Sequence, residues 1–483
     1  MHPFLTSLGP VYPEIIIAVG AMVLLLYGVF RPETDAAAET TGWLAVLVLA
    51  TAALTVALDP PGTALLFDGA FVSDRFTDFA KILVIAGSAI ALVLSFDYFR
   101  RLKSMKFEYP VLVLLASVGM LVMVSANDLI TLYLGLELQS LALYVLAAIR
   151  RDNVRSSEAG LKYFVLGALS SGMLLYGASL IYGYTGSTSF PVIASVAKGK
   201  AAAESLGLII GLVFLLVGLA FKVSAVPFHM WTPDVYEGAP TPVTALFAAA
   251  PKIAALTLLM RTLHEAFPGL GQQWQQVVTV LAIASMLLGA VAAIGQTNLK
   301  RLMAYSSIGH VGYALVGVAT NTLEGMQAVL VYLSIYLVMT LGVFACIVSL
   351  QRKEGQVVAI ADLAGLSKTN LPMAFGLLLL LFSLAGIPPL AGFFAKFYVF
   401  AAAIKAGLYP LAVIGVMASV VAAYYYLAVV KVMFFDEPKE KLLGVPRVPG
   451  IVAAAASLFV VLFAVFAGPV VDAAAVAAST LKF

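Results

Sequence analysis

The sequence predicts an all-α membrane protein with about fourteen transmembrane helices, and three observations support this fold class. Apolar residues make up 62% of the 483 residues, against roughly 45–50% in soluble proteins. Charged residues make up 11%, less than half of the usual share of about 25%. The apolar residues gather in long segments, and no polar stretch is long enough to form a soluble domain. A net charge of only +3 also provides no electrostatic signature of nucleic-acid binding.

Fourteen segments approach the length that a spanning helix needs, which is about 20 mostly apolar residues. In chain order they cover residues 11–30, 41–58, 76–96, 110–126, 128–149, 158–184, 204–225, 241–263, 276–296, 301–320, 326–350, 371–405, 411–434 and 450–471. The segments group into a three-helix N-terminal part (1–109), a first five-helix repeat (110–263), a second five-helix repeat (276–434) and a C-terminal helix (435–483).

The seventh and twelfth segments are predicted to be broken helices. The seventh runs through Pro227, and the twelfth is too long for one span and contains Pro388 and Pro389. Such breaks persist within a membrane only where protein or a wet cavity satisfies the freed backbone groups. Aligning the two breaks at an offset of 165 residues matches three identities, and breaks at corresponding positions of two halves mark the binding site in repeat transporters. Because helices 4–8 and 9–13 are five each, an odd number, the second repeat is inverted relative to the first.

The basic residues predict the orientation in the membrane. The odd-numbered connections carry sixteen lysines and arginines, whereas the even-numbered connections and the C-terminal tail carry six. Cytoplasmic loops are enriched in these residues. The odd-numbered connections should therefore face the cytoplasm, with both termini on the periplasmic side.

Four charged residues lie within apolar segments at positions that suggest a function. Lys252 lies roughly 16 Å and Glu137 roughly 14 Å along their helices, at 1.5 Å per residue. Lys222 directly precedes the seventh-helix break, and Lys396 directly follows the twelfth. A charge near the bilayer centre costs about 2.5–3.5 kcal/mol, so such residues are usually functional. Loss of hydration destabilises the charged forms of lysine and glutamate, so these groups can exchange protons near neutral pH.

Less specific interpretations apply to other residues. Lys81, Lys162 and Lys431 are expected to extend to the membrane surface, as long side chains near helix ends commonly do. Glu137 and Lys222 could form an ion pair, which either acts as a protonation switch or is only structural. His310 is either a proton relay or a packed core residue. In the connection after the seventh helix, three polar residues could line a water access path or cap helices: His229, Asp234 and Glu237.

No cofactor or metal site is expected in this chain. The single cysteine, Cys346, cannot hold an iron–sulfur cluster or close an internal disulfide. The glycine-rich nucleotide-binding motifs are absent. The energy for any transport must therefore come from outside the chain.

The most specific motif is PFHMWTPDVYEGAPTPVT at 227–244, followed by Ala250, Pro251 and Lys252. It closely resembles the signature of the antiporter-like subunits of respiratory complex I, the proton-translocating NADH:quinone oxidoreductase. The resemblance covers the whole chain. Lys396 within GFFAK, where M-type members have glutamate, and an end at Phe483 without the long lateral helix of L-type members favour the N-type branch (subunit 2).

The resemblance implies that Glu137, within LGLEL, is the glutamate of the fifth helix and Lys222 its lysine partner. Lys252 matches the central lysine, and Lys396 the lysine of the broken twelfth helix. It further implies a proton-translocating subunit of the enzyme without redox chemistry of its own, in the inner membrane of a bacterium. Flavin, iron–sulfur clusters and quinone are expected in partner subunits, which include other antiporter-like subunits. The alternatives are a subunit of a multi-subunit cation/proton antiporter or a membrane scaffold.

Overall fold

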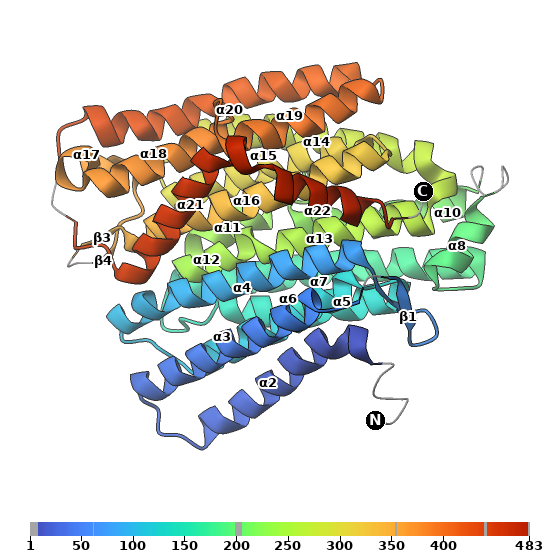
Figure 1. Ribbon diagram of the computed structural model, residues 1–483, viewed down its shortest axis with the longest axis horizontal. Helices are drawn as coiled ribbons and strands as arrows, with labels where there is room; N and C mark the ends of the chain where they lie inside the picture. The colour runs from blue at the N-terminus through green and yellow to red at the C-terminus, as the bar shows by residue number, and fades with distance from the viewer. Residues whose placement is uncertain (1–7, 61, 199–204, 353–354, 439–441, 482–483) are drawn as a thin grey trace.

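The protein is an all-α polytopic membrane protein whose helices run side by side (Figure 1). The computed structural model describes residues 8–60, 62–198, 205–352, 355–438 and 442–481. Within these residues, twelve helices are long and apolar enough to cross a membrane. Five of the basic residues used to predict the orientation lie outside the described residues: Lys200, Lys353, Lys439, Lys441 and Lys482.

The N-terminal part contains three long helices and a hairpin. Its elements are a 3-10 turn (Gly9–Val11), α2 (Tyr12–Val29), α3 (Asp35–Ala57), β1 (Ala64–Leu66), β2 (Phe71–Ser73) and α4 (Arg75–Arg101). The two strands pair antiparallel. Asp74 begins α4 with a reciprocal capping box, in which Asp74 Oδ1 accepts from Thr77 N at 2.9 Å and Thr77 Oγ1 accepts from Asp74 N at 2.8 Å.

The predicted first repeat folds into five spans, of which the last two are interrupted. Its elements are α5 (Glu108–Val124), α6 (Leu129–Ala147), α7 (Val154–Thr185), α8 (Phe190–Ala197), α10 (Leu206–Val223), α11 (Trp231–Gly238), α12 (Thr241–Ala248), α13 (Ala250–Arg261) and a π-helical turn (Thr262–Ala266). The interruption at Ala249 was not predicted. It has a physical cause, because Pro251 lacks an N–H and its ring excludes a helical carbonyl at Phe247.

The predicted second repeat and the C-terminal part follow. Their elements are a 3-10 turn (Pro268–Leu270), α14 (Gly271–Ile294), α15 (Leu299–Ala319), α16 (Leu323–Ser349), β3 (Gln351–Arg352), β4 (Gly355–Gln356), a 3-10 turn (Ile360–Leu363), α17 (Leu366–Thr369), α18 (Leu371–Ala385), α19 (Ala391–Lys405), α20 (Tyr409–Phe435), α21 (Arg447–Phe466) and α22 (Gly468–Ala478). Strands β3 and β4 pair antiparallel. The single C-terminal helix of the prediction is two helices, which meet where Pro469 follows Gly468.

The repeats are related by equivalent contacts at opposite ends of the molecule. Asp128 caps α6, and Leu129 N donates to Thr188 O at 2.9 Å. Asn298 caps α15, and Leu299 N donates to Val358 O at 2.7 Å. Each residue of the second contact lies 170 positions after its counterpart in the first. The first contact lies beside α8 and the second beside β4, which are at opposite ends of the helices in Figure 1. The second repeat is therefore inverted.

The broken helices correspond at an offset of 162 residues, so the predicted offset of 165 is wrong. The residue that caps the end of α10 is Ser224 and the one that caps the end of α18 is Gly386, both in the left-handed region, with φ +68° and +89°. The closing hydrogen bonds match as well, from Ala225 N to Ala220 O at 2.8 Å and from Ile387 N to Phe382 O at 3.1 Å. The predicted and observed offsets differ by three residues, which is nearly one helical turn. An apolar helix presents similar residues one turn further along, so sequence matching does not separate the two offsets.

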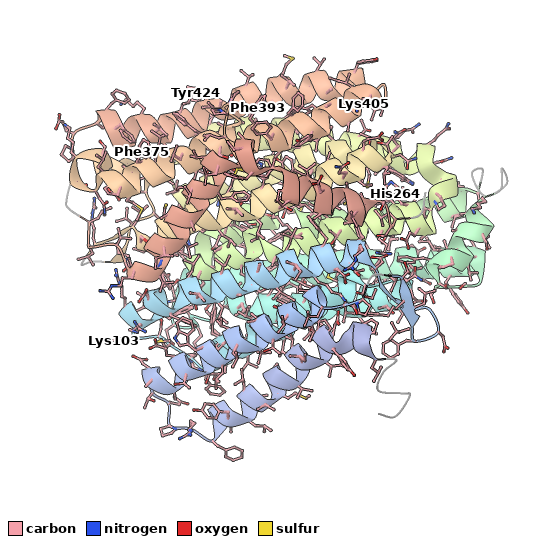
Figure 2. All side chains as sticks on the ribbon, in the orientation of Figure 1. Lys103, His264, Phe375, Phe393, Lys405 and Tyr424 are labelled. Atoms are coloured by element: carbon pink, nitrogen blue, oxygen red, sulfur yellow. The ribbon has the colours of Figure 1, made fainter. Side chains whose placement is uncertain are left out.

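Helix α2 begins and helix α22 ends toward the right-hand end of the molecule in Figure 1. Figure 2 shows Lys103, after α4, at the opposite end from Lys405 and His264. The predicted helices place Lys103 in an odd-numbered connection and the other two residues at even-numbered connections. Odd- and even-numbered connections should lie at opposite ends of the molecule, and these three residues do so.

Candidate functional site

Lys222 is buried at the end of the broken helix α10, with 4% of its surface exposed. Its Nζ donates to Ser140 Oγ of α6 and, at 3.4 Å, to the hydroxyl of Tyr144 on the same helix. It also lies 5.3 Å from the centre of the Tyr144 ring. An ammonium group in this position is held by neutral oxygens and aromatic faces.

The expected ion pair between Glu137 and Lys222 is not formed in the described part of the chain. Glu137 lies one turn before Ser140 on α6, half-buried, and its buried Oε1 has no hydrogen-bond partner. The carboxylate still interacts electrostatically with Lys222. Ser140 lies three residues further along the same face of α6, and its hydroxyl accepts the hydrogen bond from the ammonium group instead.

Lys252 lies at the same helix break as Lys222, but it contacts the backbone of α10 where Lys222 contacts side chains of α6. It sits in the first turn of α13, is 1% exposed, and its Nζ donates to Val223 O at 3.3 Å. Val223 is the last residue of α10. The last carbonyls of a helix have no partner within that helix, so Lys252 satisfies one that the break leaves free.

Lys396 repeats this arrangement at the second break. Its Nζ donates to Ala385 O, the last carbonyl of α18, at 2.9 Å and to Ser419 Oγ of α20 at 2.8 Å. Gly386 is required beside it, because φ is +89° and a Cβ there would lie 3.1 Å from Lys396 Cδ. Ala385 is the equivalent of Val223 at the 162-residue offset. Each break therefore offers its final carbonyl to a buried lysine.

His310 lies near both carbonyl-bound lysines. It interacts electrostatically with both Lys252 and Lys396. Its Nδ1 is 2.6 Å from the Tyr332 hydroxyl, and its Nε2 is 3.2 Å from the Tyr426 hydroxyl. The ring is buried and every ring nitrogen has a hydroxyl partner. The geometry is thus compatible with both interpretations of this residue, the relay and the packed core histidine.

The polar residues after the seventh helix form a surface cluster of charges. Asp234 pairs with Lys162 at 2.7 Å and with Arg301 at 2.6 Å, and Glu237 pairs with Arg301 at 3.2 Å. Burial raises the pKa of Asp234, but hydrogen bonds from Lys162 and Arg301 outweigh it, so the net pKa is lowered. The cluster borders a cavity of about 210 Å³. His229 lies in the preceding turn, half-buried.

Two of the three lysines expected to reach the surface do so. Lys162 and Lys431 have exposed side chains, and Lys431 pairs with Asp436. Lys81 does not, and this expectation is wrong. It is 1% exposed and pairs with Glu14 of α2 at 2.8 Å, because a buried carboxylate supplies the counter-charge that a buried ammonium group needs.

Sequence reasoning missed several buried polar groups. Arg261 is one of the six basic residues counted for the even-numbered connections, but it is fully buried and makes two hydrogen bonds to Asp74, at 2.9 and 2.8 Å. Lys300 is one of the sixteen counted for the odd-numbered connections, but it is buried and donates to Ala239 O at 2.7 Å. Ser140 could have been found, because it shares a helix face with Glu137. Among the described residues, no group of three or more His, Cys, Asp or Glu side chains could hold a metal ion.

Inverted repeats with two broken helices and a buried lysine at each final carbonyl define the class of antiporter-like transmembrane subunits. A family model described as NADH:quinone oxidoreductase/Mrp antiporter, transmembrane, matches residues 126–422. NADH-quinone oxidoreductase subunit N of Parvibaculum lavamentivorans is 58% identical over 475 residues, covering 98% of this chain and 97% of that one. Subunit N 1 of Rhizobium meliloti is 58% identical over 477 residues, covering 99% and 98%. The chain therefore belongs to the subunit N family of NADH-quinone oxidoreductases.

Solved structures agree with this assignment. A chain of respiratory complex I from Thermus thermophilus with bound aureothin has a TM-score of 0.82 and 33% identity, covering 96% of this chain and 99% of that chain. A chain of the Mrp complex from a Dietzia species has a TM-score of 0.79 and 24% identity, covering 100% and 98%. The second likeness concerns the fold alone.

Proposed function

We propose that the chain is a proton-translocating membrane subunit of NADH:quinone oxidoreductase and moves protons along a row of buried side chains. The row comprises Glu137, Lys222, Lys252 and Lys396, with His310 linking the last two. Redox chemistry in partner subunits, which carry flavin, iron–sulfur clusters and quinone, drives the transfers. The complex lies in the bacterial inner membrane, with both termini of this chain on the periplasmic side.

One observation carries the proposal: three buried lysines contact neutral oxygens, and none of them has a carboxylate partner among the described residues. When an ammonium group is buried without a counter-charge, its charged form is destabilised because the group loses its hydration. Such a group gives up and regains its proton at little free-energy difference, as a transfer site requires. The carbonyls at the helix breaks hold the protonated form in place without fixing its charge permanently.

The proposed order of transfer follows the row. Glu137 acts on Lys222 through its electrostatic interaction, Lys222 and Lys252 share the break of α10, and His310 interacts with both Lys252 and Lys396. Protons leave on the Lys396 side, toward the periplasm. Each charge moved works against about 2.3 kcal/mol per 100 mV. This work comes from quinone reduction.

Replacing Lys222 by alanine tests the proposal in inverted membrane vesicles of a bacterium that carries the assembled complex. Lys431→Ala is the matched control, because Lys431 has 63% of its side chain exposed and pairs with Asp436 at the end of α20. We expect NADH-driven proton uptake to fall strongly in Lys222→Ala and to stay normal in Lys431→Ala. Normal uptake in an assembled Lys222→Ala complex would refute the proposed role. Proton exchange that depends on Na⁺ and needs no NADH would identify a cation/proton antiporter instead.

A further inference from the structure

A long groove on one face of the protein has a charged end and an otherwise almost wholly apolar lining. It has a volume of about 950 Å³ and lies along α4, between α16 and the pair α21 and α22. Figure 1 looks onto this face, with α21 and α22 in front of the bundle and α4 next to α22. Helix α4 contributes residues at helical spacing, from Arg75 through Phe79, Ile82 and Ala86 to Ile90. The groove therefore follows one side of a membrane span.

The charged groups in the lining lie together at the beginning of this span. Arg75 and Asp78 are the first residues of α4 that line the groove, and Arg75 Nη1 lies 3.2 Å from Asp78 Oδ2. Asp59, just after the end of α3, interacts electrostatically with Asp78. Arg75 keeps a third of its side chain exposed. Positive and negative groups are thus both available at the membrane surface.

The remaining lining extends well into the membrane. From Arg75 to Ile90 the helix rises about 22 Å, at 1.5 Å per residue. The hydrocarbon core is about 30 Å thick, so half of it is about 15 Å. A ligand that matches the groove has a headgroup with both signs of charge and a hydrocarbon part that reaches the middle of the bilayer.

We propose that this groove is a binding site for one zwitterionic phospholipid with a primary amine in its headgroup, such as phosphatidylethanolamine. The lipid phosphate binds Arg75, whose guanidinium group matches phosphate oxygens with two parallel hydrogen bonds. The ammonium group binds Asp78, with Asp59 nearby. The acyl chains lie on Phe79, Ile82 and the residues beyond them.

The charges distinguish this occupant from an anionic lipid. An anionic lipid would place its extra negative charge near the carboxylates of Asp59 and Asp78, which disfavours it. A transmembrane helix of a partner is the other candidate occupant, and an apolar helix would offer no phosphate to Arg75 and no ammonium group to Asp78.

The test measures lipid retention by the intact complex. We compare the unaltered complex with complexes carrying Arg75→Gln or Asp78→Asn. Arg100→Gln is the matched control, because Arg100 is an exposed arginine at the other end of the same helix. Each complex is delipidated in mild detergent and titrated with phosphatidylethanolamine, phosphatidylcholine or phosphatidylglycerol, and bound lipid is counted by native mass spectrometry.

We expect one phosphatidylethanolamine site to weaken about tenfold in both groove variants, as the loss of one charge-assisted hydrogen bond implies. The site should be unchanged in Arg100→Gln, and phosphatidylglycerol should not compete for it. Equal retention in all four complexes would overturn the proposal. So would a map of the intact complex in which a protein helix covers the groove, or stronger binding of phosphatidylglycerol than of phosphatidylethanolamine.

Discussion

Replacing Ser140 by alanine should disturb proton transfer without removing any charge. Ser140 is fully buried, and its hydroxyl accepts a hydrogen bond from Lys222 Nζ. The other acceptor of Lys222, the Tyr144 hydroxyl, is 3.4 Å away and contributes a weaker bond. A hydrogen bond to a charged group contributes about 1.5–3 kcal/mol. The substitution therefore shifts the equilibrium of Lys222, toward its neutral form or toward Glu137, by roughly tenfold to a hundredfold.

The assay follows NADH-driven proton uptake and NADH:quinone turnover in the same vesicles. We expect both to fall about tenfold or more in Ser140→Ala, while Ser140→Thr, which keeps the hydroxyl, restores most of the activity. Ser117→Ala is the control, because Ser117 is equally buried but donates only to Val113 O of its own helix. Unchanged uptake in assembled Ser140→Ala, or an equal loss in Ser117→Ala, would refute this reasoning.

Three further predictions concern packing, a buried ion pair and the central histidine. Gly119→Ala should destabilise the subunit by about 1–3 kcal/mol, because the added Cβ would lie 2.4 Å from Gln139 N. Thermal inactivation of the complex should show this loss. Gly172→Ala is the control and should be neutral, because a Cβ at Gly172 would meet nothing within 4 Å. Arg261→Met should cost about 3–5 kcal/mol by leaving a buried carboxylate unpaired, and adding Asp74→Asn should recover part of the subunit level in membranes; no recovery would contradict this. His310→Phe should slow proton uptake several-fold, and normal uptake would show that the ring only packs.

The sequence alone determines which segments enter the membrane and which charges they carry. A run of about 20 apolar residues is costly in water and favourable in lipid, whatever its neighbours are. The breaks at Pro227 and at Pro388 and Pro389 follow in the same way, because proline removes a backbone donor at a known position. Lys222 and Lys396 could therefore be assigned to the breaks, and Lys252 to the interior of its apolar segment, from the sequence alone.

Only the tertiary structure decides what each buried charge touches. Partners depend on the rotation and offset of neighbouring helices, and apolar segments carry almost no information about either. Hence Lys222 contacts Ser140 where Glu137 was expected, and Lys81 meets Glu14 where the membrane surface was expected. The register of the two breaks, 162 residues apart, likewise depends on where Ser224 turns left-handed. Composition places a helix in the membrane, but packing against its neighbours selects the face it turns toward them.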